Sequence, residues 1–165
     1  MSAKASISFR QSIRWLPEGP SEPTATVVLS EPRTGVFLDV RFEKEGGKLD
    51  WAFAGYRSSV GPNSTKFTHH IDSRTLDPLD VVDVGTNKPL PDGTTIEAGE
   101  MVNPATGRVT AYEEVWRDEE SGAALFVRNA AGTVWRARVG DWQLGLGRWR
   151  GGGPFWAWQA ERVGG

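Results

Sequence analysis

The chain has 165 residues, of which 19 are basic and 21 acidic, giving a formal net charge of −2. This length fits one domain, residues 1–165, and the balanced charge argues against a nucleic acid or a membrane surface as partner. Cysteine is absent, which excludes disulfides and thiolate metal ligands. No segment has the apolar length of a signal peptide or a bilayer-spanning helix, so we expect a cytoplasmic protein.

Short segments of alternating apolar and polar residues follow one another from the N-terminus onward. In the segment 36–45, Asp39 and Arg41 share one face, which we expect to be wet. Turns rich in Gly and Pro separate the segments. The expected strands are 5–15, 24–30, 36–45, 49–59, 65–73, 80–85, 94–103, 109–120, 123–129, 133–142 and 155–163.

The spacing of these segments predicts an all-β protein. There are roughly ten of them, one about every 8–14 residues, and no segment shows a helical period over a useful length. Consecutive hairpins favour antiparallel pairing, and closure into a barrel removes exposed sheet edges. We therefore predict an antiparallel β-barrel of roughly ten strands with little helix. Such a barrel is either filled by side chains or holds one small ligand.

The segment 49–59 is apolar on both faces of an extended chain. Trp51 and Phe53 alternate with Ala52, Ala54 and Tyr56. A strand with one face in solvent would instead show one polar face. We interpret the segment as a barrel strand with one face packed in the wall and the other bordering a partly open interior.

The two histidines are adjacent, so on a strand they point to opposite faces and cannot readily bind one metal ion. Alternation puts His70 on the face of Asp72 and His69 on the face of Phe67. An inward His70 beside Asp72 could act as a general acid or base. The alternatives are a hydrogen-bonded polar plug and an exposed histidine.

A second carboxylate is placed among aromatic residues, because Glu114 shares a face with Tyr112 and Trp116. If buried there, it would have a raised pKa and could transfer a proton. The alternative is an outward carboxylate paired with arginine, which contributes little. Either Glu113 or Glu114 must face inward. The candidate catalytic residues are His70, Asp72 and Glu114.

Tryptophan is crowded into the last strands. A packed core is one interpretation, and an aromatic wall for a flat organic molecule is the other. Arginines beside these tryptophans could form a platform for single-stranded nucleic acid, but the acidic net charge disfavours it. The candidate ligand-binding residues are Trp51, Phe53, Tyr56, Tyr112, Trp116, Trp149, Trp156 and Trp158.

Several short motifs resemble the fungal Hri family, which is named for a yeast protein found as a casein-kinase partner. They are Trp-Ala-Phe-Ala-Gly at 51–55, Phe67 and Asp72, Glu-x-Trp at 114–116, and Gly-Arg-Trp at 147–149. The resemblance runs from about Leu49 to Arg162. It implies a lipocalin-like, calycin-type barrel, of which this chain has room for one where yeast-type members are longer. It implies no settled activity and no catalytic residues.

These observations predict a lipocalin-like barrel that binds a hydrophobic small molecule. Because no cofactor motif is present, we expect no cofactor and no metal. The leading hypothesis is a cofactor-free enzyme of fungal secondary metabolism, a cyclase, isomerase or lyase acting on a polyketide- or terpenoid-like intermediate. The alternatives are a non-catalytic carrier and a protein-interaction module with a filled barrel. Homodimer formation is left open.

Overall fold

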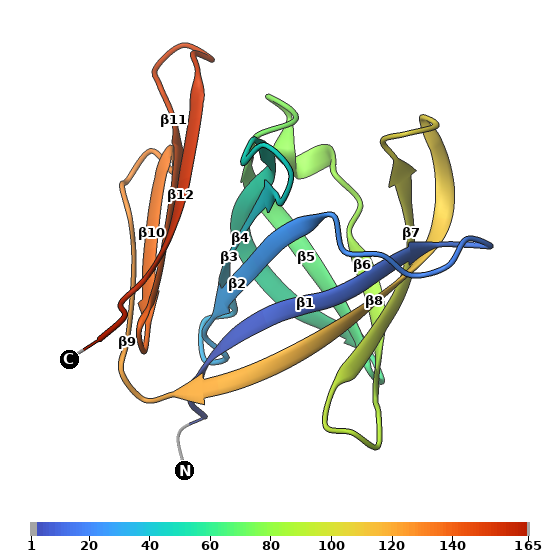
Figure 1. The fold of residues 1–165 in the computed structure, drawn as a ribbon. Helices are drawn as coiled ribbons and strands as arrows, with labels where there is room; N and C mark the ends of the chain where they lie inside the picture. The colour runs from blue at the N-terminus through green and yellow to red at the C-terminus, as the bar shows by residue number, and fades with distance from the viewer. Residues whose placement is uncertain (1–2, 165) are drawn as a thin grey trace.

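Eight antiparallel strands close into a barrel in the computed structural model, which describes residues 3–164 (Figure 1). Each strand pairs with the next, and β8 pairs with β1 to complete the closure. The strands are β1 (Ala5–Trp15), β2 (Thr24–Ser30), β3 (Val36–Glu43), β4 (Leu49–Gly61), β5 (Ser64–Asp72), β6 (Val84–Pro89), β7 (Thr95–Asn103) and β8 (Arg108–Ser121). A 3-10 helix, η1 (Pro78–Asp80), precedes β6.

The last four strands form a separate antiparallel sheet in the order β12-β11-β10-β9, at the left of Figure 1. They are β9 (Ala124–Arg128), β10 (Val134–Val139), β11 (Trp142–Arg148) and β12 (Phe155–Glu161). The prediction of an all-β, antiparallel barrel with little helix is confirmed. The barrel itself has eight strands where roughly ten were expected. Because β1 to β8 already close it, no free edge remains for the later strands to join.

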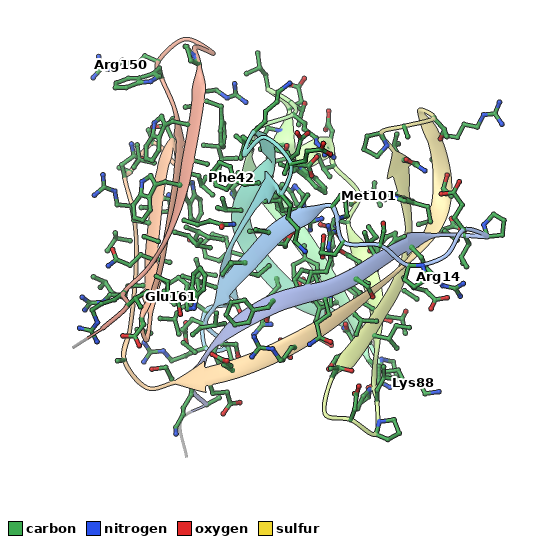
Figure 2. All side chains as sticks on the ribbon, in the orientation of Figure 1. Arg14, Phe42, Lys88, Met101, Arg150 and Glu161 are labelled. Atoms are coloured by element: carbon green, nitrogen blue, oxygen red, sulfur yellow. The ribbon has the colours of Figure 1, made fainter. Side chains whose placement is uncertain are left out.

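The four-stranded sheet packs on the outside of the barrel, across β1 to β4. Trp135, Leu144 and Leu146 of the sheet are buried against Leu38 and Val40 of β3. Figure 2 shows side chains filling the space between the two layers, with Phe42 among them. The main apolar core of the protein is therefore this layer and not the barrel interior.

Strand β4 is buried on both faces because it stands between the barrel interior and this layer. Ala52 and Ala54 are fully buried under the four-stranded sheet. Trp51 and Phe53 belong to a second, smaller apolar cluster with Phe37 inside the barrel. This is the arrangement that the two apolar faces of 49–59 predicted.

The pairing around the barrel is uneven. Strands β1 and β8 pair along nearly their whole length, from Ala5 to Trp15. Strands β5 and β6 pair over the short ladder of Ser64–Lys66 with Val84–Thr86. Backbone bonds from Phe67 N to Asp83 O and from Asn87 N to Asn63 O extend it at its two ends. The wall therefore has its shortest ladder between these two strands. Among residues 3–164, no helix is long and apolar enough to cross a membrane.

Candidate functional site

A cavity of about 360 Å³ lies in the barrel, bounded by side chains from strands β1 to β8. Aromatic and apolar side chains make up one part of its lining, and buried charged side chains make up another. The apolar part includes Val28, Phe37, Trp51, Phe53, Phe67, Met101 and Trp116. The buried polar part includes Arg10, Thr24, Asp39, Arg41, Asp83, Glu97, Tyr112 and Glu114.

Arg10 of β1 is the first of two buried guanidinium groups in the cavity. Its Nη1 donates to Glu114 at 2.9 Å, and its Nε and Nη2 donate to Glu22 at 2.9 and 3.0 Å. Nη2 also donates to Thr24 at 2.9 Å. Burial alone would raise the pKa of Glu22, but the bonds and charge of Arg10, with the bonds from Thr24, outweigh burial and lower it.

Arg41 of β3 is the second buried guanidinium. Its Nε and Nη2 donate to the two carboxylate oxygens of Asp39 at 2.8 and 2.9 Å, and its Nη1 lies 3.7 Å from Glu114. The group also lies over the rings of Trp51 and Phe53. Burial alone would lower the pKa of Arg41, but Asp39 and Glu114 outweigh burial and raise it, so the charge is fixed.

Glu97 and Glu114 face each other across β7 and β8 inside the barrel. Both are buried, and Tyr112 donates its hydroxyl to Glu97 Oε2 at 2.9 Å. Burial, then the nearby carboxylates of Glu114 and Asp83, raise the pKa of Glu97 well above its usual range. Burial and the same carboxylates raise the pKa of Tyr112, so the tyrosine stays a neutral donor. Two adjacent carboxyl groups of this kind can share a proton.

His69 of β5 bridges two buried aspartates. Its Nδ1 lies 2.8 Å from Asp72 Oδ2, and its Nε2 lies 2.7 Å from Asp83 Oδ2. The imidazole stacks on Phe53 with 4.1 Å between ring centroids, and Trp51 Nε1 donates to the other oxygen of Asp72 at 2.8 Å. Burial alone would lower the pKa of His69, but the bonds to Asp72 and Asp83 outweigh burial and raise it.

The inward histidine is His69, so the expectation that His70 faces the interior beside Asp72 is wrong. His70 is exposed on the outer side of the barrel, beside Tyr56 and Trp135. A β-bulge is the reason: Ala54 pairs with Ile71 and Gly55 pairs with His69, which leaves His70 unpaired. The extra residue breaks simple alternation and puts residues 69 and 72 on one face.

These opposite environments predict opposite pH effects for the two histidines. Because the folded-state pKa of His69 is raised, its ionic contribution to stability is present below about pH 6.5 and is lost as the pH rises through the folded pKa. His69→Gln should therefore lower the free energy of unfolding more at about pH 5.5 than at about pH 9. Urea unfolding of both proteins at the two pH values measures the difference.

His70→Gln is the matched control. Burial and the neighbouring Arg128 lower the pKa of His70, so its protonation disfavours folding as the pH falls below about 6.5. Its removal should give a small change of opposite sign at acidic pH. A loss of stability in His69→Gln that is the same at both pH values would contradict a charged His69.

The other sequence-predicted residues fall into two groups. Glu114 faces the cavity, whereas Glu113 lies outside, half-buried, where Arg14 donates to it at 2.6 Å. Asp72 is buried behind the cavity lining on His69. The predicted ligand-binding residues that line the cavity are Trp51, Phe53, Tyr112 and Trp116.

Four predicted ligand-binding residues do not line the cavity. Tyr56 packs on Trp135 in the layer outside the barrel. Trp149 is exposed at the end of β11. Trp156 and Trp158 lie over Gly147 and Gly145 on the outer face of the four-stranded sheet. The structure therefore does not place these four residues at the barrel cavity: Tyr56 faces outward from β4, and the three tryptophans belong to the separate sheet or its end.

Sequence reasoning missed Arg10, Arg41, Asp83, Glu97 and His69. Asp39 and Arg41 were expected to face solvent because a charged face usually does. Instead they lie inside the barrel, where the two opposite charges are hydrogen-bonded to each other. The available signal was that Phe37, on the same face, is apolar. Among residues 3–164, no group of three or more His, Asp or Glu side chains is arranged to hold a metal ion.

One buried donor in the site lacks a partner. Trp116 lines the cavity, and its indole Nε1 makes no hydrogen bond to any described residue. Buried polar groups are nearly always satisfied, so this N–H is an exception among the described residues.

A comparison with protein-family models matched residues 6–161 to the family described as Protein HRI1. The chain belongs to the HRI1 family. The match covers the barrel and the four-stranded sheet of this HRI1-family protein together. A search of curated proteins and a search of solved structures each gave no match. The Hri resemblance of the sequence motifs is thereby confirmed.

Proposed function

We propose that this HRI1-family barrel binds one small organic molecule in its interior cavity. The observation that carries the proposal is the cavity of about 360 Å³, lined by aromatic residues and a few convergent polar groups. Ligand pockets have volumes of about 300–1,000 Å³ and the same mixed lining. A barrel filled by side chains, as expected for a pure interaction module, would leave no such space.

The charged lining supports a ligand with polar groups over a purely hydrophobic one. Buried ion pairs recover their desolvation cost only in part, and apolar residues of similar volume often stabilise a fold better. Arg10, Arg41 and Glu114 therefore add little to stability beyond what an apolar core would supply. The presence of this charged cluster in a cavity is accounted for if the two arginines position carboxyl groups that contact a ligand.

Catalysis is a second candidate, favoured by the facing carboxyl groups of Glu97 and Glu114. A proton held at a raised pKa beside a cavity suits general acid–base chemistry without a cofactor. This supports a cyclase, isomerase or lyase, with Glu97 and Glu114 in place of the outward His70. Turnover of a bound compound should then be lost in Glu97→Gln. It should be retained in Glu100→Gln, which alters an exposed carboxylate of the same strand.

Binding of N-phenyl-1-naphthylamine, a neutral dye that fluoresces in apolar surroundings, tests the proposal. We expect saturable binding at one site. Met101→Trp should weaken the dye affinity by about tenfold or more, because the larger side chain occupies cavity space.

The matched control for this test is Glu100→Trp, which places the same side chain on the exposed side of β7. It should leave the dye affinity unchanged. Absence of saturable binding to the wild type, or equal weakening by both variants with normal melting temperatures, would rule out the interior cavity as the site.

A further inference from the structure

The two buried guanidinium groups of the cavity are already hydrogen-bonded to carboxylates of the protein. All three nitrogens of the Arg10 guanidinium donate to Glu22, Glu114 or Thr24. Arg41 has two nitrogens on Asp39, and its third faces Glu114. Neither guanidinium presents the free fork that binds a ligand carboxylate or phosphate in two places.

The buried carboxyl groups outnumber these cations. Glu22 and Asp39 offset Arg10 and Arg41. What remains at the cavity is Glu97, Glu114 and Asp83. The charge of His69 is divided between Asp83 and Asp72. The more exposed charges of the lining cancel, two aspartates against two arginines: Asp50, Asp118, Arg57 and Arg74. The negative excess therefore lies among buried groups, where charge interactions are strongest. The raised pKa of Glu97 lets this carboxyl group hold a proton when no ligand is bound, and a cationic ligand would take the place of that proton.

The lining also has an aromatic part, to which Trp116 belongs, next to Glu114 on the inner face of β8. Beyond the polar groups, Phe37, Phe53 and Phe67 supply aromatic surface for a ring.

We propose that the ligand class of this barrel is a small alkylamine that carries an aromatic ring, with its ammonium group bound by Glu97, Glu114 and Asp83. This inference rests on the proposed function of the cavity. An ammonium group has three donors and no acceptor, so it complements a cluster of carboxylates. The ring packs on the phenylalanines. A ligand carboxylate or phosphate would meet uncompensated negative charge and be rejected.

Three dansyl probes of similar size test the charge preference. Dansylcadaverine ends in an ammonium group, N-pentyl dansylamide is its neutral counterpart, and dansyl-6-aminohexanoic acid ends in a carboxylate. Affinities follow from the emission change on titration. We expect the ammonium probe to bind about tenfold or more tighter than the neutral probe, and the carboxylate probe to bind most weakly.

Variants then identify the carboxyl groups that cause the preference for the ammonium probe. Glu97→Gln should reduce the ammonium-to-neutral affinity ratio to about threefold or less. Asp83→Asn gives a second measurement if Glu97→Gln fails to fold, and Glu100→Gln is the control with an exposed carboxylate on the same strand. The inference is overturned if the neutral probe binds the wild type as tightly as the ammonium probe, or if Glu97→Gln and Asp83→Asn both keep the wild-type ratio.

The outcomes separate this inference from the proposed function. Binding of N-phenyl-1-naphthylamine that is lost in Met101→Trp, together with equal affinity for the three dansyl probes, would leave a small-molecule barrel without a preference for amines. If neither the neutral dye nor any dansyl probe binds, both proposals fail.

Discussion

Replacement of Arg41 by Met should lower the free energy of unfolding by about 3–5 kcal/mol. The substitution leaves Asp39 without its two hydrogen bonds and removes a positive charge 3.7 Å from Glu114. Both carboxylates are buried, so water cannot replace the lost guanidinium at low cost. Urea unfolding monitored by tryptophan emission measures the change.

Arg14→Met is the matched control for this prediction. Arg14 also donates to a glutamate, Glu113, at 2.6 Å, but that pair is half-exposed outside the barrel. Its loss should cost about 1 kcal/mol or less. The double variant Asp39→Leu/Arg41→Met should recover part of the loss, because it removes the stranded carboxylate. An Arg41→Met protein as stable as the wild type would show that water reaches Asp39 freely.

Replacement of Gly55 by Ala should destabilise the protein by about 3 kcal/mol or more. A Cβ atom at this position would overlap the carbonyl oxygen of Thr68 and press on the ring of His70. The obstacle is backbone in the neighbouring strand of a closed barrel, which cannot move without disturbing the β-bulge at His70.

Gly61→Ala, at the other end of the same strand, is the control. A Cβ there meets only Ser64, at an ordinary 3.8 Å. The free energy of unfolding should change by about 1 kcal/mol or less. Thermal melting and urea unfolding of the two variants give the comparison. Equal stability of both would mean that β4 and β5 separate easily at the bulge, contrary to the packing described above.

The fold was predictable where local pattern decides it. Period-two segments and Gly/Pro turns located most strands. They missed β11, and they placed β6 ahead of its observed start at Val84. The two apolar faces of 49–59 located the wall between the barrel interior and the outer layer. The division into a barrel and a four-stranded sheet was not predictable in this way. It depends on β8 returning to β1, a pairing between residues roughly 100 positions apart that leaves no local sign.

The site was predictable only in part, for two physical reasons. Alternation placed Glu114, Tyr112 and Trp116 on one inner face correctly, because β8 is regular there. At His70 a single bulged residue reversed the faces, and sequence alternation has no means of detecting it. Arg41 and Asp39 looked like surface residues in the sequence. Their ion pair, which compensates the two buried charges, is apparent only in the closed barrel.

The uneven pairing around the barrel predicts that its two sides differ in local stability against opening. Strands β1 to β4 pack between the interior cluster and the four-stranded sheet. Strands β5 and β6 are instead joined by the short ladder between Ser64–Lys66 and Val84–Thr86. Local opening occurs where the fewest backbone bonds and buried contacts must break. We therefore expect local opening of the wall to begin at this ladder. Asp83 lies at its end, where its carbonyl oxygen accepts from Phe67 N and its carboxylate bonds His69, so opening there would release a group that lines the cavity.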